Sequence, residues 1–259
     1  MAAKYADIGC SIVSDIHVGG MARLYLGVDE KGNRVVFREL LQRNVFHFRL
    51  HRGFVNGTRI RELLSPHPNI VHSIRRGRRG IVPYEVIEHI PGLSIRRLIQ
   101  QKDECLTTDA LDILRQSAAA LAHMHSLGYI HLDIKPENFL VHKTSAGLRV
   151  KLTDFDLSRD AALRRTRRPS GTAAYMAPEQ IKRHPVGPRA DIFAFGIMAY
   201  QVLTGKMPFV GKHEKQLRWR QCSDKFIPLP PTSLNPELTP KIDEIVCRCL
   251  EKRPEERFP

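Results

Sequence analysis

The most constraining feature of this chain is a short polar segment, His131-Leu132-Asp133-Ile134-Lys135-Pro136-Glu137-Asn138. A second acidic segment, Asp154-Phe155-Asp156, follows it further along the chain. Acids, a lysine and an amide at set spacings are groups suited to act on phosphates and metal ions. We do not expect a surface loop to reproduce such a pattern by chance. Composition adds little, because 42% hydrophobic residues without a low-complexity tract describe an ordinary globular protein.

The first segment closely resembles the catalytic loop of eukaryotic-type serine/threonine protein kinases, and the second resembles their metal-binding segment. Further along, Ala177-Pro178-Glu179 resembles the end of the family's activation segment. The resemblance covers nearly the whole chain and implies an α+β fold with two lobes. We therefore expect a single protein kinase domain over residues 1–259, with a small β-rich N-lobe over 1–88 and a larger, mainly helical C-lobe over 89–259.

Hydrophobic patterning agrees with this order of elements. Apolar runs at 24–28 and 35–37, separated by the turn-forming residues 29–33, predict the two strands of a hairpin. After Pro91-Gly92 the pattern becomes helical, and a mostly apolar helix is predicted over 190–204. Another helix is expected to bury a stripe formed by Leu111, Leu114, Ala118, Leu121 and Met124.

The resemblance implies roles for the polar residues of these motifs. Asp133 corresponds to the catalytic base that accepts the proton of the attacking hydroxyl, and Lys135 to the lysine that contacts the transferring phosphate. Thr172 corresponds to the threonine that bonds both of them. Asn138 and Asp154 correspond to the ligands of Mg²⁺. Lysine two residues after the base is the serine/threonine signature.

ATP is the implied cofactor, together with Mg²⁺. The backbone of Glu88 and Ile90 is expected to hydrogen-bond the adenine, with Ile87 as the gatekeeper. The predicted nucleotide contacts are Gly19, Leu24, Val36, Arg38, Glu88, Ile90 and Leu140.

Three further positions are expected to hold the large lobe together. Glu179 should pair with Arg257, and Asp191 should anchor the backbone of the catalytic loop, as in the family. The alternative for all three is ordinary surface charge.

The small lobe departs from the family pattern at its glycine loop and at its phosphate-binding lysine. His17 and Ala22 replace the outer glycines and only Gly19 remains, so the loop is expected to hold ATP less closely, or to be an ordinary hairpin. Arg38 occupies the position of the lysine. Arginine keeps the charge but is a wide planar fork, so the exchange is not conservative at a phosphate site.

The lysine's usual partner, a glutamate of the regulatory helix, is also absent from its expected register. That register falls near Thr58, or on Arg59 or Ile60 if a short deletion is allowed, and none of these is acidic. Glu62 is the nearby stand-in, although a solvated helix charge is the favoured interpretation of it. The ion pair of the family is therefore expected to be absent or rebuilt.

Two changes concern the catalytic loop and the activation segment. Leu132 replaces the arginine that usually receives an activation-loop phosphate, so weak control by phosphorylation of Thr166 or Ser170 is expected. The loop's own arginines are the alternative receptor: Arg164, Arg165, Arg167 and Arg168. Asp156 replaces a glycine, and we do not regard this change as disabling, because aspartate tolerates unusual backbone conformations.

Two functions remain open from the sequence. The first is a serine/threonine kinase that transfers the γ-phosphate of ATP to protein hydroxyls, with reduced turnover. The second is a pseudokinase that serves as a binding or scaffold module. The retained motifs favour the first, and the altered small lobe supports the second.

Charge, hydropathy and cysteine content argue against other classes of protein, such as nucleic-acid-binding, membrane-spanning and secreted proteins. The net charge of +14 includes an arginine cluster at 75–79, but no aromatic interleaving accompanies it, so nucleic-acid binding is not favoured. The longest apolar stretch, 192–203, is too short to span a bilayer, and residues 1–10 lack the apolar core of a signal peptide. Five scattered cysteines fit a reducing cytoplasm. The expected partner is a protein substrate or binding partner, and the oligomeric state is open.

Overall fold

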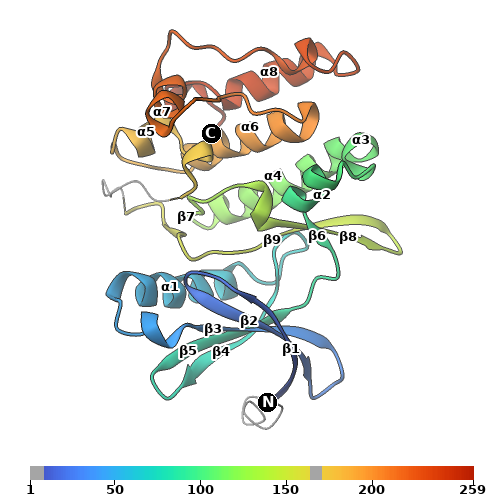
Figure 1. Cartoon of the computed structure of the whole chain (residues 1–259), viewed down its shortest axis with the longest axis vertical. Coiled ribbons are helices and arrows are strands. Elements are labelled where there is room, and N and C mark those ends of the chain that lie inside the picture. Colours follow the sequence, from blue (N-terminus) through green and yellow to red (C-terminus); the bar gives the residue numbers. More distant parts are fainter. Residues whose placement is uncertain (1–8, 164–170) are drawn as a thin grey trace. The chain divides into compact units, whose positions relative to one another are not determined.

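The computed structural model describes residues 9–163 and 171–259 and divides the chain into two compact units (Figure 1). The first unit comprises Met1–Pro91 and Thr153–Ser158, and the second Gly92–Leu152 and Arg159–Pro259. The expected α+β class is confirmed, because the first unit is built on a β-sheet and the second is mainly helical. The short segment that carries Asp154 and Asp156 packs with the first unit, although it follows the catalytic loop in sequence.

The first unit holds a five-stranded antiparallel sheet in the order β1-β2-β3-β5-β4 (Figure 1). Its elements are β1 (Cys10–Val18), β2 (Ala22–Asp29), β3 (Arg34–Leu40), η3 (Gln42–Asn44), α1 (Phe48–Leu64), β4 (Ser73–Arg79) and β5 (Val82–Glu88). The predicted hairpin turn between β2 and β3 is confirmed. The Oδ1 atom of Asp29 accepts hydrogen bonds from the backbone of Lys31 and Asn33, at 2.9 and 2.8 Å.

Strand β3 separates the core of the first unit into two sides, because its side chains alternate between the faces of the sheet. Phe37 is fully buried on one side, between Tyr25 and Tyr84. Leu40 lies on the other side, in a cluster with Phe54 of helix α1. Alternation places Arg38 on the same side as Leu40, beneath α1.

Helix α1 approaches the segment 153–158 closely, and a glycine makes this possible. A Cβ atom on Gly57 would lie 2.8 Å from the carbonyl oxygen of Phe155. The neighbouring Asn56 donates a hydrogen bond of 2.8 Å to the carbonyl of Ser158. The backbone around Asp156 is therefore fixed against the helix.

The second unit contains helices α4 and α6, two small sheets and the C-terminal elements (Figure 1). Its first elements are β6 (Leu93–Ser94), α2 (Ile95–Gln101), α3 (Cys105–Thr108), α4 (Ala110–Ser126), β7 (Tyr129–Ile130), η4 (Pro136–Asn138), β8 (Phe139–Thr144), β9 (Gly147–Leu152) and β10 (Arg159–Asp160). The remaining ones are η5 (Ala173–Tyr175), α5 (Pro178–Ile181), α6 (Arg189–Thr204), α7 (Glu214–Cys222), η6 (Pro231–Ser233), α8 (Pro240–Cys249) and η7 (Pro254–Glu256).

Two helices of this unit, α6 and α4, can be compared with the helices predicted from the sequence. The helix predicted over 190–204 is α6, which ends at Gly205 in the left-handed conformation with φ of 67°. For α4 the predicted stripe was partly wrong, because Leu111 and Ala118 are exposed. The buried residues are Ala110, Ile113, Leu114, Gln116, Ser117, Ala120, Leu121 and Met124. Among the described residues, no helix combines the length and apolar character needed to cross a bilayer.

Candidate active site

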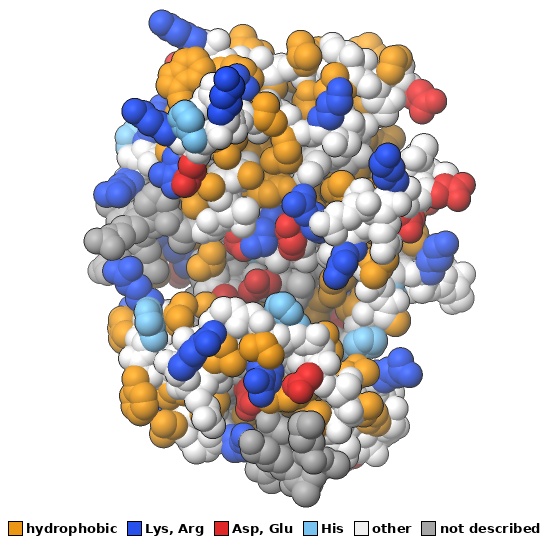
Figure 2. Space-filling model, in the orientation of Figure 1, with side chains coloured by type: hydrophobic (Ala, Val, Ile, Leu, Met, Phe, Trp, Pro, Cys, Tyr) orange, Lys and Arg blue, Asp and Glu red, His pale blue; other side chains and the backbone are white. Residues whose placement is uncertain are grey.

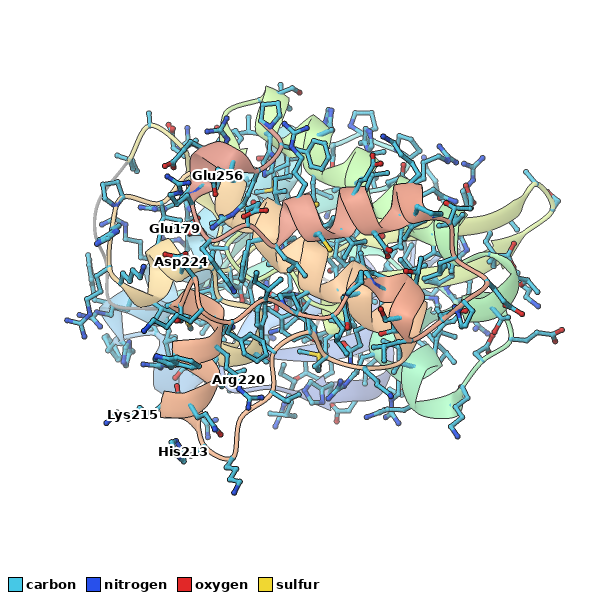
Figure 3. All side chains as sticks on the ribbon, turned by 90° about the horizontal axis from the view of Figure 1, so that it is seen from above. Glu179, His213, Lys215, Arg220, Asp224 and Glu256 are labelled. Carbon is cyan, nitrogen blue, oxygen red and sulfur yellow. The ribbon has the colours of Figure 1, made fainter. Side chains whose placement is uncertain are left out.

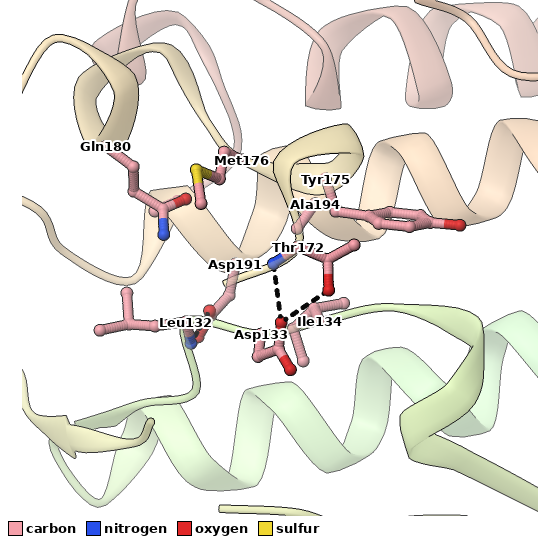
Figure 4. A pocket seen from close by; sticks show the side chains of 10 residues that line it. Leu132, Asp133, Ile134, Thr172, Tyr175, Met176, Gln180, Asp191 and Ala194 are labelled. Carbon is pink, nitrogen blue, oxygen red and sulfur yellow. Dashed lines mark hydrogen bonds between the residues drawn. The ribbon is translucent and has the colours of Figure 1, made fainter. Parts of the chain in front are cut away.

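The second unit brings together Asp133, Lys135 and Thr172, and Figure 4 shows the contact between Asp133 and Thr172. The Oδ1 atom of Asp133 accepts hydrogen bonds from the backbone nitrogen and the hydroxyl of Thr172, at 3.1 and 3.3 Å. Lys135 donates to Oδ2 of Asp133 at 2.5 Å and to the Thr172 hydroxyl at 3.1 Å. The structure thus places a carboxylate, an ammonium group and a hydroxyl in mutual contact, as the resemblance led us to expect.

A buried carboxylate at the start of helix α6 holds the loop that carries these groups. Asp191 accepts hydrogen bonds of 2.8 Å from the backbone nitrogens of His131 and Leu132. It also contacts Nε2 of His125 at 2.9 Å. Burial opposes ionisation of Asp191, but the bonds and charges of the two histidines outweigh it and hold its pKa below the ordinary value.

The anchored loop has an unusual backbone conformation. Leu132 has a φ of 67°, which costs energy for a residue with a side chain and persists only where the surroundings enforce it. The two hydrogen bonds that the backbone nitrogens of His131 and Leu132 donate to Asp191 provide that enforcement.

Asn138, predicted to bind magnesium, is buried beside the catalytic loop. Its amide nitrogen donates to the backbone oxygen of Asp133 at 2.8 Å and to Oδ2 of Asp133 at 3.4 Å. Both bonds use the NH₂ group, so the amide oxygen is the atom suited to a hard cation. Asp154, the other predicted ligand, belongs to the first unit. Within residues 9–163 and 171–259, no three His, Cys, Asp or Glu side chains form a metal cluster.

A small pocket opens beside Asp133 and Thr172 (Figure 4). Gln221 of helix α7 supports its wall, because its amide nitrogen donates to the carbonyls of Ala173, Ala174 and Met176 at 3.0, 3.2 and 3.2 Å. Sequence reasoning missed Gln221, which follows no motif. The pocket is lined by Leu132, Asp133, Ile134, Thr172, Tyr175, Met176, Gln180, Ala190, Asp191 and Ala194.

An ion pair fixes the end of the activation segment to the C-terminal part of the chain. Glu179, labelled in Figure 3, accepts two hydrogen bonds from Arg257, at 2.8 and 3.0 Å. Both side chains are buried, and Arg257 also lies over the ring of Phe193. The expected pairing is confirmed and the surface-charge alternative is excluded.

In the first unit, Arg38 is buried and bound by two carboxylates. Its Nη1 donates to Glu85 at 2.8 Å and its Nη2 donates to Asp156. Phe54 covers the guanidinium, with the ring centroid 4.7 Å from Cζ. Burial disfavours the charged arginine, but Asp156, Glu85 and Asp154 outweigh this effect and raise its pKa above the ordinary value. Burial also raises the pKa of Asp156 to about 6, against the opposing effect of Arg38.

The ion pair expected to be absent or rebuilt is rebuilt on Glu85, which sequence reasoning did not identify. Glu62 forms a half-exposed pair with Arg76 at 2.5 Å, so its interpretation as a solvated helix charge is confirmed. The preceding residue of helix α1, Arg61, is buried instead, and its Nη1 lies 3.5 Å from Glu85 Oε1. Strand pairing is the signal that could have identified Glu85, because the register of β3 and β5 places it directly opposite Arg38.

The other predicted nucleotide contacts are distributed over both units. In the sheet, Leu24 lies opposite Arg38, and Val36 lies two residues before it, so these three side chains share one face. Glu88 ends strand β5 and its backbone nitrogen donates to the His72 carbonyl at 3.1 Å. Ile90 is buried just beyond it.

The two remaining contacts lie in a turn and in a strand. Gly19 lies in the turn between β1 and β2, where its nitrogen donates to the Ala22 carbonyl at 3.0 Å, a hairpin geometry. Leu140 lies on β8 in the second unit. Thr166, Ser170 and the arginines at 164, 165, 167 and 168 lie outside the described residues.

Comparison with known proteins supports the interpretation of these motifs. The family model of the protein kinase domain matches residues 11–259. A probable serine/threonine-protein kinase of Clostridium acetobutylicum is 31% identical over 95% of this chain, and the serine/threonine-protein kinase PknB of Mycolicibacterium smegmatis is 29% identical over 93%. The serine/threonine-protein kinase PknA of Mycobacterium tuberculosis is 31% identical over 94%.

The chain spans 37%, 39% and 56% of the lengths of these three relatives. Its match to the family model nevertheless extends over most of both compact units and includes every motif described above. The chain belongs to the protein kinase domain family.

Proposed function

We propose that this chain is an ATP- and Mg²⁺-dependent serine/threonine protein kinase that phosphorylates hydroxyl groups of a protein substrate. The observation that carries the proposal is the contact of Asp133 with both Lys135 and Thr172 in a loop anchored by Asp191. In this arrangement Asp133 is the base that accepts the proton of the attacking hydroxyl. Lys135, at 2.5 Å from that carboxylate, supplies positive charge where the phosphate receives the nucleophile.

The residues present fit a nucleotide with its metal ion. Leu24 and Val36 place apolar side chains on the sheet face that also carries Arg38, which suits a base and its phosphates. Asn138 of the second unit and Asp154 of the first each carry a side-chain oxygen of the kind that Mg²⁺ prefers, and the family resemblance assigns both to the metal. Bound Mg²⁺–ATP would supply the phosphoryl group and neutralise charge that develops on it.

The pseudokinase alternative receives less support. It rested on Arg38, on the missing glutamate of the regulatory helix and on the altered glycine loop. Of these, the first two are compensated, because Arg38 has two carboxylate partners, Glu85 and Asp156. A scaffold would not require the contacts among Asp133, Lys135 and Thr172.

The proposed location is the cytoplasm, which is supported by five free cysteines. Lysine and arginine side chains are interspersed with other types on the face seen in Figure 2. A protein is the proposed substrate because the relatives are named serine/threonine-protein kinases.

The experiment is transfer of labelled γ-phosphate to a generic serine/threonine substrate by the purified chain, beside Asp133→Asn. We expect the parent to transfer label and Asp133→Asn to lose at least a hundredfold in rate. Glu62→Gln, which changes an exposed carboxylate of helix α1, is the matched control and should behave as the parent. Equal rates for the parent and Asp133→Asn would contradict the proposal.

A further inference from the structure

The first unit contains a buried cluster of four charged side chains: Arg38, Arg61, Glu85 and Asp156. None is more than 9% exposed, and their formal charges cancel. Buried ion pairs are costly to desolvate, and apolar residues of similar volume often stabilise a fold as well or better. A cluster of this kind therefore points to a requirement other than stability. One of its members, Arg38, is the proposed phosphate contact, so the requirement is the position of Arg38.

The carboxylate at the centre of the cluster belongs to the sheet. Glu85 lies opposite Arg38 in the ladder between β5 and β3, and it is fully buried. Directly paired residues of antiparallel strands are held about 5 Å apart by the backbone hydrogen bonds on either side. The 2.8 Å bond from Arg38 to Glu85 is thus built into one continuous sheet.

Helix α1 contributes a cation to the cluster, and the contact is loose. Arg61 reaches Glu85 at 3.5 Å, and its Nε and Nη1 have no hydrogen-bond partner in the part of the chain that the structure describes. The ring of Phe155 lies 5.2 Å from its guanidinium carbon. Arg61 is therefore attracted by charge and by the aromatic face, while the directional bond of Glu85 goes to Arg38.

We propose that Glu85 is the positioning residue for Arg38, and that it replaces the helix-borne carboxylate with a strand-borne one. The inference rests on the proposed kinase function, in which Arg38 contacts the nucleotide phosphates. With its anchor in the sheet, Arg38 keeps its position whether or not helix α1 shifts. Helix α1 interacts with Glu85 only through Arg61. The charges are therefore reversed relative to the family pattern, because here the helix carries a cation and the strand carries the carboxylate.

The test is a double-mutant cycle of Glu85→Gln and Arg38→Met, read by the KM for ATP, the KM for the protein substrate and kcat. A positioning role predicts that Glu85→Gln raises the KM for ATP about tenfold, the effect of losing one charge-assisted hydrogen bond. The KM for the protein substrate should change less than twofold. In the Arg38→Met background, Glu85→Gln should add less than twofold to the KM for ATP, because it acts through Arg38.

Two further variants exclude a merely structural effect. Glu62→Gln removes the other candidate carboxylate and should leave the KM for ATP unchanged. Arg61→Glu combined with Glu85→Gln returns a carboxylate to the helix and should recover at least half of the loss on a logarithmic scale. If Glu85→Gln does not fold, Glu85→Asp takes its place, because it keeps the charge while withdrawing it from Arg38.

The outcomes separate this inference from the proposed function. If the parent transfers no phosphate, the kinase proposal fails, and the same cycle is then read from the dissociation constant for ATP by calorimetry. The positioning role is overturned if Glu85→Gln weakens ATP equally with and without Arg38. It is also overturned if Glu62→Gln produces the larger loss.

Discussion

Replacing Arg38 by lysine restores the residue type typical of the family, yet the structure predicts that this change destabilises the chain. Arg38 spans two carboxylates because its two Nη atoms diverge, one towards Glu85 and one towards Asp156. A lysine presents one ammonium nitrogen and cannot reproduce that fork. Arg38→Lys therefore keeps at most one of the two directional bonds and leaves the other buried carboxylate without its partner.

The magnitude follows from what is lost. A hydrogen bond to a charged group contributes about 1.5–3 kcal/mol, and removing one partner from a buried pair costs about 3–5 kcal/mol. Because lysine preserves the charge and one bond, we expect a loss of about 2–4 kcal/mol in the free energy of unfolding. Arg38→Lys combined with Asp156→Gly should recover most of this loss, since the stranded carboxylate is then absent.

The assay is urea unfolding followed by circular dichroism at neutral pH, with equal m-values as the check that the midpoints report stability. Glu62→Lys, a charge change on the exposed side of helix α1, is the control and should shift the free energy by less than about 1 kcal/mol. A stability of Arg38→Lys equal to that of the parent would refute the argument that a fork holds both carboxylates.

Three further predictions concern the second unit. Asp191→Asn should lower the free energy of unfolding by about 1–3 kcal/mol at neutral pH, because the loop nitrogens lose a charged acceptor. The pKa of Asp191 is lowered on folding, so its contribution to the free energy of unfolding is present above about pH 4 and falls as the pH drops further. In unfolding titrations below that pH, the stabilities of the parent and Asp191→Asn should converge. Gln221→Ala should raise the KM for a protein substrate several-fold and leave the KM for ATP unchanged, measured by initial rates; equal changes in both would show a global effect. Glu179→Gln and Arg257→Met should each cost about 3–5 kcal/mol in urea unfolding, and the double variant should cost less than the sum of the two; additive costs would contradict a direct pair.

The sequence was sufficient for the contacts among the motif residues of the second unit, because these interacting groups lie in linear motifs. Asp133, Lys135 and Thr172 are found in contact as the motifs indicated, and Glu179 pairs with Arg257 across a long sequence separation. Their roles in catalysis remain predictions. The α+β fold was likewise predictable from the order of strand and helix patterns.

The charged cluster of the first unit was not predictable from the same patterns. Glu85 becomes the partner of Arg38 through strand register, which is set by the packing of the whole sheet. Asp156 joins them because its segment packs with the first unit, where Gly57 allows helix α1 to approach it. Helix α4 shows a smaller failure, since the apolar Leu111 fits the helical period but lies 56% exposed near the helix start.

The pairing of Arg38 with both Glu85 and Asp156 also has an evolutionary consequence. Because one guanidinium satisfies two buried carboxylates, a single substitution at Arg38, Glu85 or Asp156 leaves an unbalanced charge in the interior. Return to the lysine-based arrangement therefore passes through less stable intermediates, a form of epistasis that retains the present set once it is assembled. Homologues that carry arginine at this position should accordingly carry an acid on the facing strand, and the residues should be inherited together.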